Sequence, residues 1–251
     1  MKFNVLTIFP DIFPGNLGSG LIGKALHNAK FHLNLIDLTL YKDDGRIDDR
    51  PIGGQEGMII KAQTIDNAIK HNNLRNNKII YLSPRGQVFN QSIANNLLYY
   101  ENITLICGRY EGIDARILLK YDIQELSIGD FILCGGEVAA MVVIETVVRL
   151  IPSVLKNQQS IMNESFSNYL LEHDYFTKPD NWSAMIVPDI LKSGNHKEIK
   201  RWQFINSYNI TKQNRPDLIL LFNHDFIIVF FFFNIWKKLC FKIYQKQYIN
   251  Q

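Results

Sequence analysis

The pattern that most limits the fold of this chain is the alternation of strand-like and helix-like segments over its first two-thirds. Four short β-rich runs, each followed by turn residues, lie at residues 3–9, 31–38, 78–84 and 103–108. Between them, residues 19–30 and 90–100 place apolar side chains at helical spacing. Strands that alternate with helices favour an α/β domain with a mostly parallel sheet.

The final third of the chain has a different pattern. Residues 136–155 predict a long apolar helix that stops near Pro152, and residues 156–168 are polar and non-periodic, as a linker is. Residues 196–212 predict a basic amphipathic helix in a second, smaller domain. The sequence is therefore interpreted as a first domain, a flexible linker and a helical second domain at residues 1–156, 157–168 and 169–251.

Composition excludes several classes of protein. A net charge of +3 permits a polyanionic partner without requiring one. The cysteines Cys107, Cys134 and Cys240 are scattered, which supports neither a zinc site nor a disulfide framework. The first residues predict a strand and not a signal peptide. Residues 226–236 are intensely apolar but shorter than the roughly 20 residues that span a bilayer. We expect a cytoplasmic protein without membrane contact, in which residues 226–236 form a buried helix or strand.

Polar and glycine-rich segments follow three of the expected strands. They comprise residues 83–86, 108–112 and 127–130. In a parallel α/β sheet, ligands bind beyond the carboxyl ends of the strands. The three segments therefore predict a ligand site at one edge of the sheet.

The stretch at 126–141 combines Gly129, Gly135 and Gly136 with apolar residues that could enclose a flat aromatic group. Glycine allows a close approach of backbone to ligand. Neither G-x-G-x-x-G nor a P-loop is present, so a small adenosine-type ligand fits better than a dinucleotide or an ATP phosphate. Taken alone, the stretch fits a glycine-punctuated turn before a core helix equally well.

A second charged and glycine-rich segment, residues 46–58, holds Asp48, Asp49 and Arg50 ahead of Pro51. Charged residues on a flexible loop suggest a lid or a contact to a polar substrate. By itself, such a segment is more often a solvated loop.

Together these segments resemble the bacterial tRNA (guanine-N1)-methyltransferase family, which methylates the guanine 3′ of the anticodon at tRNA position 37 and so supports reading-frame maintenance. The matching strings, in order, include "IFPDIF", "DDRPIGGQEGM", "YLSPRG", "CGRYEGIDAR", "SIGDFILCGGE", "RLIPSVL", "LLEHDYFTKP", "VPDILKSGNHKEIKRW" and "NRPDLI". The match runs from the N-terminus to about residue 218, after which the chain becomes phenylalanine-rich.

The resemblance implies a SPOUT-type α/β fold with a deep trefoil knot and a small helical C-terminal domain. It also implies a homodimer, S-adenosylmethionine as the methyl donor, tRNA with guanine at position 37 as the substrate, and Mg²⁺ as an assisting ion. Two alternatives stay open: a knotted RNA methyltransferase with another target nucleotide, and a catalytically impaired RNA-binding relative. Complete donor-loop glycines argue against the second, because a pure binder has no use for them.

Site residues carry over from the resemblance by position. The methyl donor would contact Ser83, Pro84, Gly86, Gly108, Tyr110, Glu111, Gly112, Ile128, Gly129, Asp130, Phe131, Ile132, Leu133, Gly135 and Gly136. The substrate would contact Asp49, Arg50, Gly57, His196, Lys200 and Arg201. Arg149 and Glu164 would carry catalysis, although without the resemblance Arg149 reads as a helix-terminal charge that covers apolar surface.

The chemistry requires residues of these types. Guanine N1 carries a proton at neutral pH, so its attack on a sulfonium methyl needs a base within hydrogen-bond reach. Loss of that proton places negative charge on O6, which a guanidinium can stabilise. The chain departs from the family at three places: Glu164 replaces the usual Asp, Gln55-Glu56-Gly57 replaces Gly-Pro-Gly, and Ala139 replaces Pro.

Overall fold

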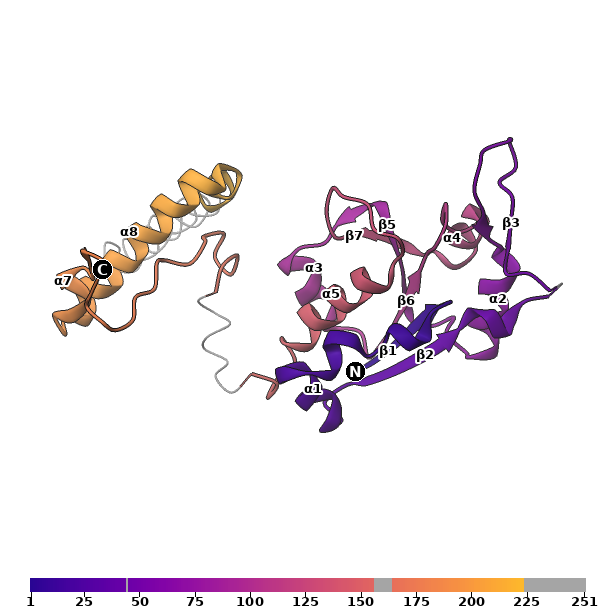
Figure 1. Cartoon of the computed structure of the whole chain (residues 1–251), viewed down its shortest axis with the longest axis horizontal. Helices are drawn as coiled ribbons and strands as arrows, with labels where there is room; N and C mark the ends of the chain where they lie inside the picture. The colour runs from indigo at the N-terminus through magenta and orange to yellow at the C-terminus, as the bar shows by residue number, and fades with distance from the viewer. Residues whose placement is uncertain (44, 156–163, 224–251) are drawn as a thin grey trace, which may run out of the picture. The chain divides into compact units, whose positions relative to one another are not determined.

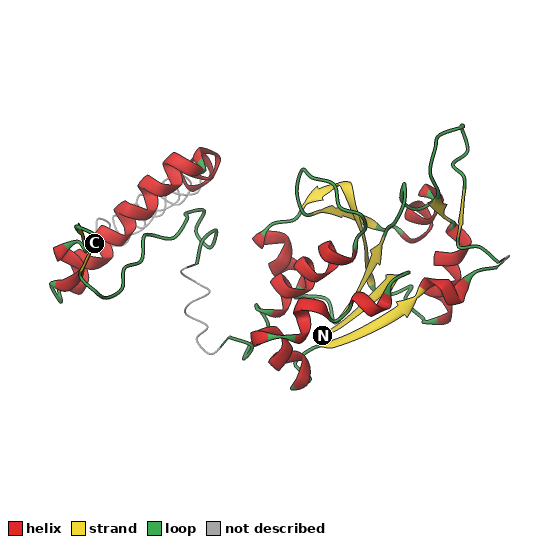
Figure 2. Cartoon of the chain, in the orientation of Figure 1, coloured by secondary structure: helices red, strands yellow, loops and turns green. Residues whose placement is uncertain are grey.

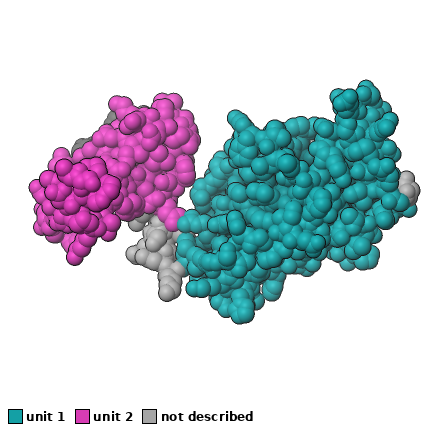
Figure 3. Space-filling view, in the orientation of Figure 1, with its two compact units in different colours: residues 1–158 teal, residues 159–251 magenta. Residues whose placement is uncertain are grey.

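A computed structural model describes residues 1–43, 45–155 and 164–223 of the chain. The chain divides into two compact units, residues 1–158 and 159–251, shown in different colours in Figure 3. The expected linker falls partly on residues 156–163, and the apolar run at 226–236 falls wholly on residues 224–251. Both of these ranges lie outside the described residues.

The first unit is built on a five-stranded sheet with the order β2-β1-β6-β5-β7 (Figures 1 and 2). Its strands are β1 (Lys2–Thr7), β2 (His32–Asp37), β5 (Lys78–Val88), β6 (Asn102–Cys107) and β7 (Gln124–Ser127). Every neighbouring pair is parallel, which confirms the predicted parallel α/β sheet. Parallel pairing places the carboxyl ends of all five strands at one edge.

Helices cover both faces of this sheet (Figure 2). The α-helices are α1 (Gly20–His27), α2 (Ala62–His71), α3 (Gln91–Leu97), α4 (Ala115–Tyr121) and α5 (Glu137–Val148). Helix α5 contacts α1 and α3, whereas α2 contacts α4. Short 3-10 turns lie at Pro10–Ile12, Gly15–Gly18 and Leu38–Tyr41.

Side chains along β1 alternate between the two faces of the sheet, so that neighbouring residues contact different layers of helices. Leu6 is fully buried in a cluster with Ile65 and Ile69 of α2 and Ile117 of α4. The neighbouring Thr7 reaches the α5 layer, because successive strand residues point to opposite faces. The core therefore lies on both sides of β1, and the strand is buried throughout its last five positions.

The elements of this unit that were not predicted include α2, α4 and β7. In α2 the apolar signal is confined to a stripe around Ile65 and Ile69, one turn apart among polar residues. Helix α4 has seven residues and begins where the Asp114 side chain accepts a hydrogen bond from the Arg116 N–H at 2.9 Å. These elements are too short to show a long apolar run.

Helix α5 also ends earlier than the sequence predicted, at Val148 instead of near Pro152. The Leu150 and Ile151 N–H groups bond three residues back, to Val147 and Val148. This tighter winding closes the helix because the residue before a proline avoids the helical conformation.

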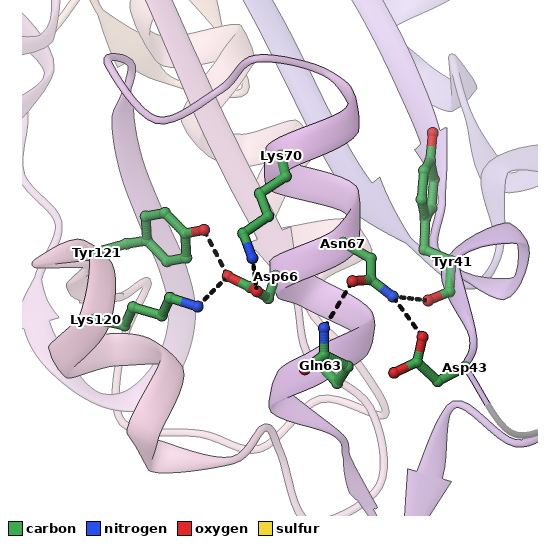
Figure 4. A network of polar contacts seen from close by, with 8 residues as sticks. All are labelled: Tyr41, Asp43, Gln63, Asp66, Asn67, Lys70, Lys120 and Tyr121. Carbon is green, nitrogen blue, oxygen red and sulfur yellow. Dashed lines mark hydrogen bonds and ion pairs between the residues drawn. The ribbon is translucent and has the colours of Figure 1, made fainter.

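A buried carboxylate joins α2 to α4 on one face of the sheet (Figure 4). Asp66 has a 5% exposed side chain and bonds Lys70 at 2.8 Å, Lys120 at 2.6 Å and the Tyr121 hydroxyl at 2.6 Å. Burial would raise the pKa of Asp66, but these three donors outweigh it and lower the pKa to about 2. The cluster therefore holds the two helices together by a fully satisfied charge.

Among its described residues, the second unit contains a two-stranded hairpin, two helices bounded below and a further helical segment at residues 216–223. The hairpin strands are β8 (Asn181–Trp182) and β9 (Met185–Ile186), and the two helices are α7 (Asp189–Lys192) and α8 (His196–Asn214). An extended segment is fixed to α8, because the Asp174 N–H donates to the Asn206 side chain at 2.7 Å. The rings of His173 and Phe176 each lie 6.2 Å from that of Trp202. Within the described residues, no helix has the length and apolar character needed to cross a membrane.

Candidate active site

A cavity of about 260 Å³ lies beyond the carboxyl ends of β5, β6 and β7. It is lined by the segments that follow those strands, which the sequence predicted to converge. The expected donor residues on its wall are Ser83, Pro84, Gly108, Tyr110, Glu111, Gly112, Ile128, Gly129, Phe131, Ile132, Leu133, Gly135 and Gly136. The wall therefore combines backbone from glycine-rich turns with the apolar side chains of the 128–133 segment.

Close backbone packing at the end of β6 explains two of the glycines. A Cβ atom on Gly136 would lie 2.7 Å from the Cys107 Cα atom, and one on Gly108 would lie 2.7 Å from the Tyr81 hydroxyl. The Gly136 N–H donates to the Gly108 carbonyl at 3.0 Å. These contacts join the start of α5 to the end of β6, and a side chain at either position would separate them.

The turn after β7 is stabilised by Ser127. Its hydroxyl accepts from the Gly129 N–H at 3.2 Å and donates to the Gly129 carbonyl at 3.1 Å. Gly129 has a φ of +142°, a conformation that other residues rarely adopt. The turn leaves Phe131 and Ile132 exposed at the rim of the cavity.

Two expected donor residues, Gly86 and Asp130, do not line the cavity. Asp130 is exposed on the turn after β7. Gly86 instead lies against β7, where an added Cβ atom would be 2.3 Å from the Leu126 nitrogen. Strand β5 shifts its register on β7 between Leu82 and Gln87, so Gly86 lets the chain approach β7 as it leaves the sheet.

Seven lining residues were not among the individually expected donor contacts, although Arg109 and Ser127 belong to segments predicted to converge at the site. The seven are Tyr81, Leu82, Arg109, Leu126, Ser127, Cys134 and Ala139. Tyr81 interrupts an aliphatic strand two residues before Ser83 of the Ser-Pro turn, a signal that could have revealed it. Burial, and next the Glu125 carboxylate, raise the pKa of its phenol, which therefore stays protonated at neutral pH.

Arg109, which lines the cavity, is held by a buried carboxylate. Its Nε atom lies 3.4 Å from Oε2 of Glu137, whose side chain is 2% exposed. The Arg109 Nη1 atom donates to the Cys134 carbonyl at 3.1 Å, and its guanidinium lies 4.5 Å from the centre of the Phe9 ring. Arg109 thus connects the end of β6 to the segment that precedes α5.

A second structure adjoins this cavity. Strands β3 (Asp48–Asp49) and β4 (Ile59–Ile60) form a short antiparallel pair, and the loop between them returns to the cavity, where the Glu111 N–H donates to the Met58 carbonyl at 3.0 Å. The predicted substrate residues Asp49 and Arg50 line a separate cavity of about 730 Å³ beside Asp114 and Arg116. The Arg116 side chain lowers the pKa of Asp114.

Comparison with known sequences assigns the chain to a family. A profile described as tRNA (Guanine-1)-methyltransferase TrmD matches residues 1–221. The chain belongs to this family.

Curated members of the family are similar over nearly their whole length. The tRNA (guanine-N(1)-)-methyltransferase of Ehrlichia canis is 51% identical over 230 residues, which cover 90% of this chain and 98% of the relative. The enzyme of that name from Ehrlichia ruminantium (strain Welgevonden) is 51% identical over 86% of this chain and 94% of the relative. That of Neorickettsia sennetsu is 44% identical over 87% and 98%.

The residues expected to carry catalysis in this methyltransferase family lie in different units of the chain. Arg149 caps α5 in the first unit, where it is partly buried and its N–H donates to the Glu145 carbonyl at 3.1 Å. Glu164 lies in the second unit, and its carbonyl accepts from the Ser167 N–H at 3.1 Å. The turn that contains Glu164 also bonds to later residues of its own unit, since the Phe166 N–H donates to the Leu170 carbonyl.

The remaining expected RNA contacts lie on α8. His196, Lys200 and Arg201 are exposed. Lys197 and Arg201 are four residues apart, which places them on the same face of the helix. Arg201 is also 3.8 Å from Glu198, one turn earlier. The helix begins at Asn195, whose side chain accepts from the Glu198 N–H.

Proposed function

We propose that this chain transfers the methyl group of S-adenosylmethionine to N1 of the guanine at tRNA position 37. The observation that carries the proposal is the cavity at the ends of β5, β6 and β7. Its walls come from the three sequence segments by which the chain resembles the family. Family membership and the names of the relatives give the reaction class, and the cavity gives a place for the donor.

The residues of the cavity fit a flat, partly apolar donor. Gly135 and Gly136 line the cavity, where their backbone groups could bond an adenine ring. Ile128, Ile132 and Leu133 supply apolar surface for the same ring. S-adenosylmethionine supplies an activated methyl group on a sulfonium. The chain itself must therefore bind the donor, orient the guanine beside it and remove the proton from guanine N1.

Two side chains are assigned to the chemistry. The Glu164 carboxylate would take the proton from guanine N1, and the Arg149 guanidinium would stabilise the charge that develops on O6. The remaining rate acceleration would come from positioning the extruded guanine beside the methyl donor. Among the described residues, no three carboxylate, imidazole or thiol side chains lie close enough together to hold a metal ion. We therefore assign no residues to the binding of Mg²⁺.

The proposed enzyme is a knotted homodimer. Helix α5 exposes Val138 and Val142, one turn apart, beside a partly exposed Met141. Phe9, Ile12 and Leu21, on segments of the same unit, are also exposed large apolar residues. A second copy of the chain would cover this apolar surface, which a monomer would leave in water. The knot would consist of the segments after β5, β6 and β7 that form the cavity.

The second unit is assigned to tRNA. The exposed cations Lys197, Lys200 and Arg201 of α8 would contact phosphates, and the helix would thereby hold the anticodon stem in register. Asp49 of β3, with Arg50 and Gly57 of the β3–β4 loop, would also contact the substrate.

Methyl transfer onto defined transcripts tests the whole proposal. Two tRNA transcripts that differ only in G or A at position 37 are incubated with the protein and labelled S-adenosylmethionine. We expect label only on the G37 transcript, and nuclease mapping should place it at N1 of that guanine. Label at another nucleotide would show a different target, and binding of tRNA without transfer would show an RNA-binding relative.

A further inference from the structure

The Arg109–Glu137 ion pair lies at the wall of the cavity, with Arg109 on the wall and Glu137 behind it. Of the described residues that line the cavity, Arg109 and Glu111 are the ones that carry charge. Glu137 does not line it, yet its Oε2 atom is 3.4 Å from the Arg109 Nε atom. An added Cβ atom on Gly135 would lie 2.4 Å from that Nε atom and 2.5 Å from Oε2, so the pair is pressed against the wall.

Two features besides the contact with Arg109 hold Glu137 in place. Its Oε1 atom accepts from the Thr7 hydroxyl at 2.8 Å, and Thr7 is fully buried on β1. Glu137 is also the first residue of α5, where the helix dipole favours a negative charge. The carboxylate is thus held at a position from which it cannot swing away.

Arg109 gains a fixed position from the same set of contacts. Its guanidinium is bonded to the Cys134 carbonyl and lies over the Phe9 ring, while its Nε atom is closed off from solvent. Without Glu137, a guanidinium would remain beside the cavity with no opposite charge on its inner side. The positive charge of that guanidinium would repel a positively charged group of a ligand in the cavity and so weaken the binding of the ligand.

We infer that Glu137 is a positioning residue that offsets the charge of Arg109 so that the cavity accepts a cationic donor. The inference rests on the proposed function, because S-adenosylmethionine bears a sulfonium whereas its product S-adenosylhomocysteine is the neutral thioether. The two ligands share every other charged group. The ratio of their dissociation constants therefore reports the electrostatic potential of the cavity, and a general loosening of the site would weaken both ligands alike.

Calorimetry with both ligands tests this inference on three variants. Glu137→Gln keeps the shape and removes the negative charge, so the ratio of the S-adenosylmethionine to the S-adenosylhomocysteine constant should rise. Two unit charges on the order of 10 Å apart at an effective dielectric constant of ~20 would change it about tenfold. Arg109→Gln should lower the ratio, and the charge-balanced double variant should return it toward that of the parent.

Thr7→Val is the matched control, since it removes the hydrogen bond to Glu137 but leaves both charges. It should leave the ratio unchanged even if both affinities fall. An unchanged ratio in both Glu137→Gln and Arg109→Gln would overturn the inference. Should Glu137→Gln fail to fold, the direction of change in Arg109→Gln decides alone. A parent protein that binds neither ligand would instead contradict the proposed function.

Discussion

Gly57 lies so close to Glu111 that it has no room for a side chain. A Cβ atom on Gly57 would be 2.5 Å from Cγ and 2.7 Å from Oε1 of Glu111. Gly57 also has a φ of +97°, and the Glu111 N–H bonds the carbonyl of the next residue, Met58. The β3–β4 loop and the charged wall of the cavity are therefore one packed structure.

Gly57→Ala should lower the affinity for S-adenosylmethionine about tenfold, because the new methyl group must push Glu111 off the cavity wall. The matched control is Gly54→Ala, which also has a positive φ, +80°, but meets no atom within 4 Å. It should keep the affinity of the parent and lose at most about 1–2 kcal/mol of stability from backbone strain. Equal affinities of the two variants for S-adenosylmethionine, measured by calorimetry, would show that Gly57 has no part in the donor site.

Asp66 should stabilise the first unit in a pH-dependent way. Its pKa is lowered from 3.8 to about 2 in the folded state, so its contribution is complete above pH ~4 and is lost as the pH falls toward 2. Asp66→Asn should therefore cost on the order of 2 kcal/mol at pH 7, and the difference from the parent should shrink between pH 4 and 2.

Denaturant unfolding at several pH values measures this difference. Asp43→Asn is the control, because Asp43 is exposed and bonds only the Asn67 side chain in the same view (Figure 4). It should change the free energy of unfolding by less than about 0.5 kcal/mol at every pH. A constant cost of Asp66→Asn from pH 7 to 2 would show that the carboxylate charge contributes nothing.

The two cysteines of the first unit should differ in reactivity. Burial, and next the Glu137 carboxylate, raise the pKa of the Cys107 thiol well above its usual value, whereas Cys134 is exposed on the cavity wall. In a Cys240→Ser background, iodoacetamide should alkylate Cys134 and leave Cys107 intact until the protein unfolds. Saturating S-adenosylmethionine should slow the alkylation several-fold. Peptide mass spectrometry would detect the contrary result, modification at Cys107.

The strands that carry the cavity were predictable because their apolar runs are long enough to be recognised in isolation. Strand β7 was missed, since it has four residues of which only Leu126 and Ser127 are buried. The ion pair of Arg109 with Glu137 was missed for another reason. Its members belong to the end of β6 and the start of α5, and their contact is created only when the glycines between the two elements let them approach.

The resemblance identified most of the cavity wall, but it could not give the contacts that hold the wall. Gly86 was expected at the ligand because it belongs to a matching string, whereas the structure places it against the β7 backbone. A matching motif indicates that a residue is needed at a position. It does not tell whether that residue faces the ligand or packs against a neighbouring strand.

If the proposed dimer draws its donor cavity and its catalytic residues from different subunits, two inactive variants should complement each other. Gly135→Val would push its side chain against Arg109 and Glu137 and so deform the cavity wall. Arg149→Ala would remove the charge that stabilises O6. Co-expressed heterodimers should regain a fraction of the parent rate, since one of the two composite sites is intact. Heterodimers that stay inactive while each parent variant is folded and dimeric would rule out shared sites.

Glu164 provides the sharpest test of the proposed chemistry, because the family usually has Asp at this position. The two carboxylic acids have similar reference pKa values, ~4.3 and ~3.9, and they differ in reach by one methylene group. A misplacement of ~1 Å in a fixed site can cost on the order of a hundredfold in rate. The Glu164 backbone is bonded into a turn of the second unit, so its longer side chain must supply the reach that positions the carboxylate.

We therefore predict that Glu164→Gln abolishes methyl transfer and leaves the affinity for S-adenosylmethionine unchanged, because the amide keeps the size of the side chain but cannot accept the N1 proton. Glu164→Asp should stay within about tenfold of the parent, a barrier change of ~1.4 kcal/mol, if the turn can move by one methylene when tRNA binds. Single-turnover rates on the G37 transcript measure both variants. Full activity of Glu164→Gln would assign the base to another group, and Glu172 or Asp174, later in the same unit, would then be the next carboxylates to replace.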